Sequence, residues 1–155
     1  MENYHFDLFA DYFQFYICDE AYNGVPSLDW SGQCIEDMIG IVPGLLNIGT
    51  VRNMTVPVEV EVRDSEPKED SSHWDHIVEA GIVIRAGAVI IAGLMDDPDE
   101  AARVKIAPGS YKARVYYGDL DTLSTDGLDG EDCYKVVLWR GEFTEARVIK
   151  RHSLA

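Results

Sequence analysis

Cysteine is scarce in this chain and follows no metal-binding pattern. The three cysteines, Cys18, Cys34 and Cys133, form no CxxC pair and no Cys/His zinc spacing, and an odd number cannot all pair within one chain. Reduced thiols are typical of cytoplasmic proteins, whereas disulfide frameworks are typical of secreted ones. We therefore expect a cytoplasmic protein in which the three thiols are small core residues.

Long apolar runs are also missing. No stretch of 18 uncharged apolar residues occurs, and the first twelve residues lack the basic region and apolar segment of a secretory signal. The sequence predicts neither membrane spanning nor secretion, which agrees with the expected cytoplasmic location.

Positive charge is the third deficit. Thirteen Lys and Arg residues stand against 28 Asp and Glu residues, giving a formal net charge of -15. A field of this sign repels nucleic-acid phosphates and anionic membrane surfaces, so direct binding to either is disfavoured. The same field speeds encounter with a basic protein, and nucleases are often basic. Solubility alone is the alternative explanation for the acidity.

Catalytic motifs are not found. The sequence has no GxSxG nucleophile elbow and no GxxxxGK or GxGxxG phosphate-binding loop. We therefore predict that the chain is not an enzyme and needs no cofactor.

Two polar clusters are candidate cation sites. His73, Asp75 and His76 could ligate a metal, but in a strand the two imidazoles would point to opposite faces. The acidic residues between positions 119 and 132 offer oxygen ligands, yet their order does not match a calcium-binding loop. We interpret both clusters as ordinary solvated loop residues and predict no metal.

What is present is the composition of a folded domain, with 46% hydrophobic and 10% aromatic residues. A chain of 155 residues suits one core, so we expect a single domain spanning residues 1–155. Short alternating segments separated by turn residues predict a mostly β fold. The expected architecture is a β-sandwich of about eight or nine strands with one short helix, and a barrel is the second choice.

Several expected elements are specific enough to be checked. The first strand, residues 4–18, is expected to break near Ala10 and Asp11, and Pro57 predicts that the valine-rich strand at 54–62 is an edge strand or is bulged. Hairpins are expected for the pair 76–85 and 88–93 and for the pair 133–139 and 143–150. The residues of the short helix, which Asp29 or Ser31 could cap, include Cys34, Ile35, Met38 and Ile39.

Arg52 and Asn53 lie between two expected strands. An arginine there could clamp a carboxylate, either inside this acidic protein or on a partner. We favour the internal ion pair.

One set of residues resembles a known family, the competence protein J family, through its order and spacing: Phe15, Asp19, Pro26, Asp29, Trp30, Ile35, Glu36, Arg52 and Asn53. The segment APGSYKARVYY at 107–117 is similar to a turn-strand unit of that family, whereas 64–76 and 118–132 look like additions to it. The resemblance covers the first 62 residues well and the rest loosely. It implies a related fold and inhibition of the nuclease of DNA uptake during natural transformation.

These observations lead to one hypothesis and two rivals. We expect a non-enzymatic, acidic binding protein, an inhibitor or immunity-like protein that sequesters a basic nuclease. The rivals are a small-ligand or sugar-binding β-sandwich that uses Tyr116, Tyr117 and Trp74, and a metal-dependent enzyme. No feature of the sequence specifies an oligomeric state. The candidate partner-binding residues are the family-linked Asp29, Trp30, Arg52 and Asn53 and the acidic-loop residues Asp126, Asp129 and Asp132.

Overall fold

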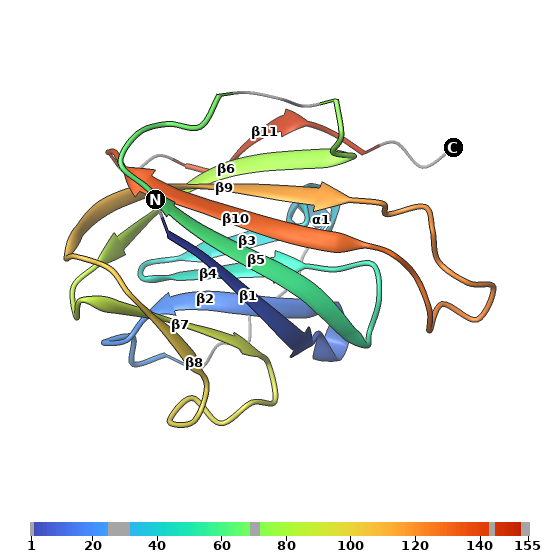
Figure 1. The fold of residues 1–155 in the computed structure, drawn as a ribbon, viewed down its shortest axis with the longest axis horizontal. Helices are drawn as coiled ribbons and strands as arrows, with labels where there is room; N and C mark the ends of the chain where they lie inside the picture. The colour runs from blue at the N-terminus through green and yellow to red at the C-terminus, as the bar shows by residue number, and fades with distance from the viewer. Residues whose placement is uncertain (1, 25–31, 69–71, 143–144, 153–155) are drawn as a thin grey trace.

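Two β-sheets pack face to face in the computed structural model, which describes residues 2–24, 32–68, 72–142 and 145–152 (Figure 1). One sheet has six strands in the order β1-β5-β10-β9-β6-β11, and the other has five in the order β3-β4-β2-β7-β8. The strands are β1 (Glu2–Phe9), β2 (Gln14–Asp19), β3 (Ile39–Val42), β4 (Leu45–Gly49), β5 (Thr55–Arg63), β6 (His76–Ile84), β7 (Ala88–Gly93), β8 (Ala102–Lys105), β9 (Gly109–Gly118), β10 (Cys133–Arg140) and β11 (Arg147–Lys150).

The predicted mostly β sandwich is confirmed, with eleven strands in the described residues rather than eight or nine. Part of the difference is the expected break in the first strand, where a 3-10 turn at Asp11–Phe13 separates β1 from β2. No helix in the described ranges has the length and apolar character needed to cross a bilayer.

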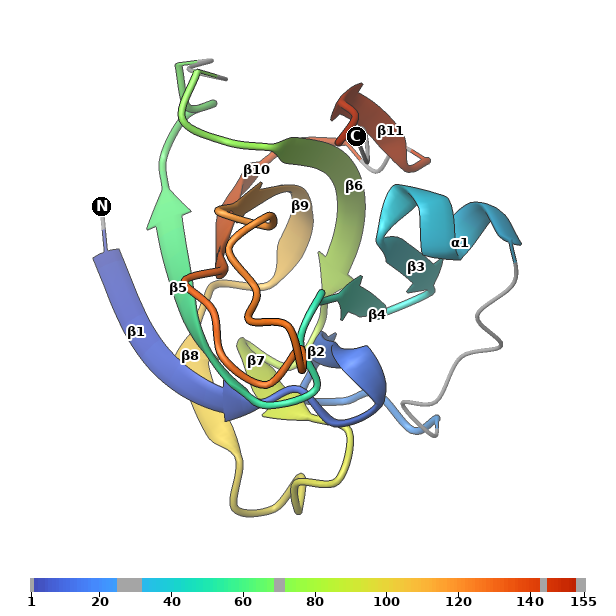
Figure 2. The same cartoon turned by 90° about the vertical axis from the view of Figure 1, so that its right-hand side faces the viewer.

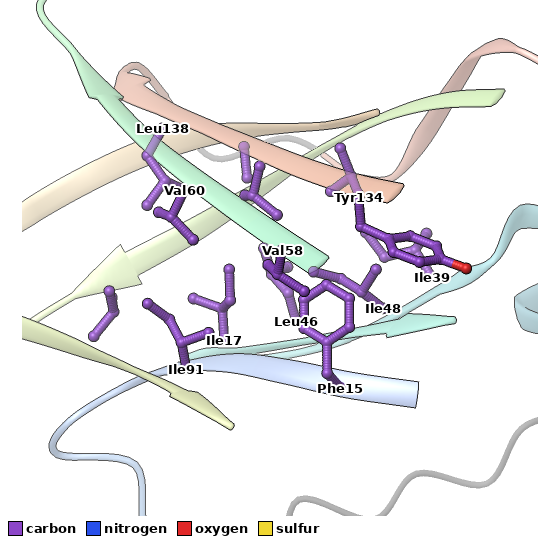
Figure 3. Packing of buried hydrophobic residues seen from close by; sticks show 14 of the residues in the cluster. Phe15, Ile17, Ile39, Leu46, Ile48, Val58, Val60, Ile91, Tyr134 and Leu138 are labelled. Carbon is purple, nitrogen blue, oxygen red and sulfur yellow. The ribbon is translucent and has the colours of Figure 1, made fainter. Parts of the chain in front are cut away.

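The core lies between the sheets and draws side chains from both, as Figure 3 shows. In β5 the alternation works as the sequence predicts, because Val56, Val58 and Val60 are buried in this core. Across the sandwich interior, Phe15 of β2 meets the ring of Tyr134 of β10 edge-on, with centroids 6.1 Å apart.

The outer face of the six-stranded sheet is partly covered as well. Arg114 and Glu79 form a buried ion pair there at 2.8 Å, and the guanidinium lies over the ring of Trp139. The carbonyl of Pro67, in the connection before β6, accepts a hydrogen bond from Arg114. β6 is therefore buried along almost its whole length, because Val78, Ala80 and Ile82 face the core on its other side.

Both predicted hairpins are wrong in their pairing. β6 and β7 belong to different sheets, and β11 pairs with β6 rather than with β10. The carboxylate of Asp19 on β2 accepts hydrogen bonds from the backbone N–H groups of Arg85 and Ala86, at 2.9 and 3.1 Å. These bonds fix the chain where it crosses between sheets instead of folding back.

Pro57 does not mark an edge strand, because β5 lies between β1 and β10. The ladder with β10 begins one residue later, at Val58, so the proline stands just outside that pairing. Its missing N–H is tolerated there.

The helix α1 (Gly32–Asp37) is shorter than expected. Met38 adopts a left-handed backbone (φ 60°) and Ile39 begins β3, so neither is helical. Asp29 and Ser31, the expected caps, lie outside the described residues.

Cys18 alone of the three cysteines is a core residue, whereas Cys34 and Cys133 are partly exposed, and all three are free thiols. Burial raises the pKa of the Cys18 thiol to about 11.

Candidate functional site

A groove of about 890 Å³ opens at one end of the sandwich, where β2, β5, β6 and β10 begin and β4 and β9 end. Figure 2 faces this end and shows the 3-10 turn, α1 and the loop 119–132 arranged around it. Six of its lining residues define the groove: Tyr12, Phe13, Ile35, Met38, Val51 and His76.

The walls of the groove expose large apolar side chains. Tyr12 is 65% exposed, Phe13 52% and Ile35 60%. Single exposed apolar residues are ordinary on protein surfaces, but a group of them around one hollow is typical of a binding site.

The backbone of the groove is strained. Tyr12, Phe13 and Met38 have φ values of 58°, 61° and 60°, a left-handed region that bulky residues rarely enter. Each such conformation costs on the order of 1–3 kcal/mol, and these outliers cluster at functional sites. The one other non-glycine residue of this kind in the described chain, Asp119, begins the loop beside the groove.

Hydrogen bonds from the sandwich hold this backbone in place. The N–H of Thr50 donates to the carbonyl of Phe13 at 2.9 Å. The carbonyl of Met38 accepts two hydrogen bonds, from the N–H of Gly49 at 2.9 Å and from the hydroxyl of Tyr117 at 2.6 Å. The groove is therefore built on rigid elements rather than on a free loop.

A buried polar network lies beneath the groove. Arg52 Nε is 2.8 Å from Asp132 Oδ1, and the hydroxyl of Tyr134 donates to the other carboxylate oxygen at 2.7 Å. The same hydroxyl accepts the N–H of Val51, a groove residue, at 3.0 Å. Burial, followed by the hydrogen bond to Asp132, raises the pKa of Tyr134, so the phenol stays protonated and donates.

This network gives Arg52 the internal ion pair that the sequence favours, and it changes the interpretation of Asp132. The whole residue Asp132 is 0% exposed and Arg52 only 9%. The sequence predicts that Asp132 presents charge to a partner, but its carboxylate is enclosed and neutralised by Arg52. Asn53 is half-buried next to this pair, and among the described residues its buried side-chain oxygen has no hydrogen-bond partner.

His76 is the buried histidine at the groove. Its Nε2 donates to the carbonyl of Asp37 at 2.8 Å, and its Nδ1 accepts the N–H of His152 at 3.0 Å. That pair of bonds requires a neutral ring with the proton on Nε2. Burial lowers the pKa of His76 by more than the bond to Asp37 raises it, and the nearby Arg151 and His152 lower it further.

The structure does not bring the candidate metal ligands together. His73 is exposed, His76 is buried, and Asp75 accepts the N–H of Leu120 at 2.8 Å. Within the described ranges, no three His, Cys, Asp or Glu side chains are grouped as metal ligands would be.

The loop 119–132, here called the acidic loop, borders the groove. Asp121 lies 3.2 Å from the ring of His152, and Arg52 donates to the carbonyl of Leu128 at 3.4 Å. Asp126 and Asp129 are exposed on this loop. A hydrogen bond from Ser124 lowers the pKa of Asp126, so this carboxylate is ionised at neutral pH.

Two other sets of predicted site residues have different outcomes. Asp29 and Trp30 lie outside the described residues. Tyr116 and Tyr117 are buried, so they cannot form the exposed sugar-binding platform of the rival hypothesis. Trp74 is half-buried and packs on Tyr116, with ring centroids 5.3 Å apart.

Sequence reasoning missed the groove. It assigned Tyr12 and Phe13 to an interrupted strand and Ile35 to a short helix. The available signal was the break in alternation at Ala10 and Asp11. Adjacent side chains in a strand point to opposite faces of the sheet, so the two aromatic residues that follow the break cannot both point into the core.

No protein-family model matches the sequence, and a comparison with curated proteins finds no relative. Among solved structures, the chain is similar to ComJ of Bacillus subtilis, described as an inhibitor of the DNA degrading activity of NucA. The TM-score is 0.69, and the match covers 91% of this chain and 96% of ComJ at 14% identity. The chain has the fold of ComJ.

The resemblance to the competence protein J family is thereby confirmed at the level of the fold. A second solved structure, described as crocagin biosynthetic gene J, is similar with a TM-score of 0.60 and 15% identity, over 91% of this chain and 98% of that one. Because each match covers more than nine-tenths of both chains, the likeness extends over both sheets of the sandwich and is not confined to one of them.

Proposed function

We propose that this chain is a non-enzymatic inhibitor that binds and sequesters a basic nuclease in the cytoplasm. The observation that carries the proposal is the fold, which the chain shares over nearly its full length with ComJ, an inhibitor of DNA degradation by NucA. Fold alone does not specify function, so the charge and the site must support the same conclusion.

The charge distribution supports a basic partner. The net charge is -15, and the acidic loop exposes five carboxylates at the end of the sandwich that also carries the groove: Asp119, Asp121, Asp126, Asp129 and Glu131. Such a field accelerates encounter with a positively charged protein and repels nucleic acid. An inhibitor of this kind would act on the enzyme rather than on its DNA substrate.

The proposal is tested by inhibition of DNA degradation. The purified chain is titrated into each basic nuclease of the source organism, and hydrolysis of a fluorescent double-stranded DNA is followed. We expect stoichiometric inhibition of one nuclease, weaker at high salt. A gel-shift assay with DNA alone is the control for masking of the substrate. Full activity of every nuclease at a tenfold excess of the chain would overturn the proposal.

The volume of the groove favours one other candidate, a small-ligand binding protein. A volume of about 890 Å³ falls within the range of small-molecule sites, roughly 300–1,000 Å³. A ligand that binds only the native state raises the melting temperature. A thermal-shift screen of metabolites therefore separates this candidate from the nuclease inhibitor.

A further inference from the structure

We infer that the groove is the centre, or anchor, of the interface with a basic protein partner, and that it binds one large apolar side chain of that partner. Lys or Arg side chains beside this apolar one pair with the carboxylates of Glu36 and of the acidic loop, here called the acidic rim. This inference rests on the proposed function for the identity of the partner. It adds the surface, the chemistry of the occupant and the residues that make the contact.

The apolar part of the anchor comes from three segments far apart in the sequence. The 3-10 turn contributes Tyr12 and Phe13, α1 contributes Ile35, and the segment before β5 contributes Val51. The exposed aromatic rings are rigid and supply large contact areas with little loss of side-chain entropy. Interface energy is concentrated at such apolar centres, where a side chain of the partner becomes fully desolvated.

The strained backbone of Tyr12 and Phe13 indicates that their exposed side chains have a role in binding. An aromatic residue at φ near 60° is unfavourable, whereas glycine or asparagine would adopt the same backbone more easily. Two consecutive aromatic residues nevertheless occupy such positions, at Tyr12 and Phe13. Packing does not explain this choice, because both rings are more than half exposed.

Charge identifies the occupant as a basic protein. The basic side chains at the rim of the groove are already engaged: Arg151 pairs with Asp37 at 2.8 Å, and the ring of His152 lies 3.2 Å from Asp121. Glu36, on the groove wall, is exposed and has no ion-pair partner among the described residues. The acidic loop reaches the groove through the contact of Asp121 with His152. The carboxylates around the groove therefore complement cations.

The anchor is also preorganised. The turn at Phe13 and the turn at Met38 are both tied to the sandwich by the backbone hydrogen bonds from Thr50 and Gly49. A partner therefore meets a formed surface and does not have to order it, which favours affinity.

Short peptides test the groove without any nuclease. The isotope-labelled full chain is titrated with a peptide of one phenylalanine between two pairs of lysines and followed by nuclear magnetic resonance. We expect saturable shifts at Tyr12, Phe13, Ile35 and Met38. A matched peptide with serine in place of phenylalanine should bind at least tenfold more weakly, and so should one with glutamates in place of lysines.

Each alternative has its own signature in this titration. Equal binding of the serine peptide would mean that charge alone acts. Equal binding of the glutamate peptide would mean that the groove is a general apolar pocket. Shifts confined to other surfaces would place the site elsewhere. Any of these results overturns the inference, whether or not a nuclease is inhibited.

Variants of the full chain connect the groove to the nuclease. The combination Tyr12→Asn, Phe13→Asn and Ile35→Gln removes the apolar surface, and asparagine tolerates the left-handed backbone. The control Met95→Gln changes a residue that is 71% exposed and does not line the groove. We expect at least a tenfold loss of affinity for the inhibited nuclease in the triple variant and less than twofold in the control, with the melting temperature retained in both.

The two proposals can fail separately. If a nuclease is inhibited equally by the triple variant and the parent chain, the nuclease-inhibitor function stands and the groove inference falls. If no nuclease is inhibited while the lysine-phenylalanine peptide binds in the groove, the groove stands as a docking site and the nuclease proposal falls.

Discussion

At the scale of single residues, the ion pair of Arg52 and Asp132 joins two positions that are 80 residues apart. Both side chains are buried, and the hydroxyl of Tyr134 donates a hydrogen bond to the second oxygen of the carboxylate. The pair ties the end of the acidic loop, just before β10, to the segment that lines the groove. Its contribution is therefore to position the site and to hold two distant parts of the chain together.

Replacing Asp132→Asn should destabilise the fold by about 3 kcal/mol, because it leaves the buried guanidinium of Arg52 without a counter-charge. Urea unfolding monitored by tryptophan fluorescence measures the change. The control is Asp129→Asn, which changes an exposed carboxylate in the same loop and should leave the free energy of unfolding nearly unchanged. Equal effects of the two variants would contradict a structural role for the pair.

His76 should make stability depend on pH just below neutrality. Burial lowers its pKa in the folded chain from the ordinary value of 6.5, so as the pH falls below about 6.5 the unfolded chain takes up a proton that the folded chain does not. Stability is then constant above this value and falls below it, by at most about 1.4 kcal/mol per pH unit from this group.

Melting temperatures between pH 5.5 and 7.5 test this dependence. The variant His76→Gln should lose part of the slope, while His73→Gln, at an exposed position outside the buried network, should keep it. An unchanged slope in His76→Gln would assign the dependence to another group.

The internal ion pair of Arg52 could be predicted from the sequence, because an arginine between two strands of an acidic protein has many carboxylates within reach. Its partner could not be identified, since Asp132 becomes adjacent only after β5 and β10 align in parallel. The same limit applies to the groove. Tyr12, Ile35 and Val51 meet through the fold, and no local pattern links them.

At the scale of elements, local alternation predicts where strands occur but not which strands pair. The valines of β5 show that the position of a strand can be predicted, because a two-residue period is sufficient to place them in a core. The crossing from β6 to β7 shows that the pairing of strands cannot. A glycine turn at Gly87 is compatible with a hairpin or with a change of sheet, and Asp19, 66 residues before Arg85, decides between them.

The contact between the end of β1 and β7 gives a prediction about the two sheets. A Cβ on Gly93 would lie 2.2 Å from the carbonyl oxygen of Phe9, and backbone cannot move aside as a flexible side chain could. Gly93→Ala should therefore destabilise the fold by about 1–3 kcal/mol.

The matched control for this substitution is Gly32→Ala. Outside the helix itself, no atom of the described residues lies within 4 Å of the added Cβ at this helical position, so the change should be neutral or stabilising by up to about 1 kcal/mol. Chemical denaturation of both variants measures the difference. Similar stabilities would show that β1 and β7 can separate at this point without loss.

At the scale of the whole molecule, the placement of the charge matters as well as its sum. The acidic loop lies at the groove end, whereas Glu2, Asp64 and Glu142 lie near the opposite end of the six-stranded sheet, where Val62 and Trp139 pair with their neighbours. If net charge alone attracted the partner, carboxylates at either end would be equivalent. If the acidic loop guides docking, its charges should matter more.

Two charge-matched variants distinguish these cases. The loop variant carries Asp121→Asn, Asp126→Asn and Asp129→Asn, and the control carries Glu2→Gln, Asp64→Asn and Glu142→Gln. With the inhibited nuclease at low salt, we expect the loop variant to associate about three- to tenfold more slowly and the control less than twofold, because charges near the docking surface dominate steering.

Salt dependence completes this test, measured by stopped-flow association at rising ionic strength. At about 0.5 M salt the screening length falls to a few ångströms, so the loop variant and the parent chain should associate at nearly the same rate. Dissociation should change little, because exposed rim charges act mainly on encounter while the apolar anchor controls the lifetime of the complex. Equal slowing in both variants would show that the total charge of -15, rather than its placement beside the groove, attracts the partner.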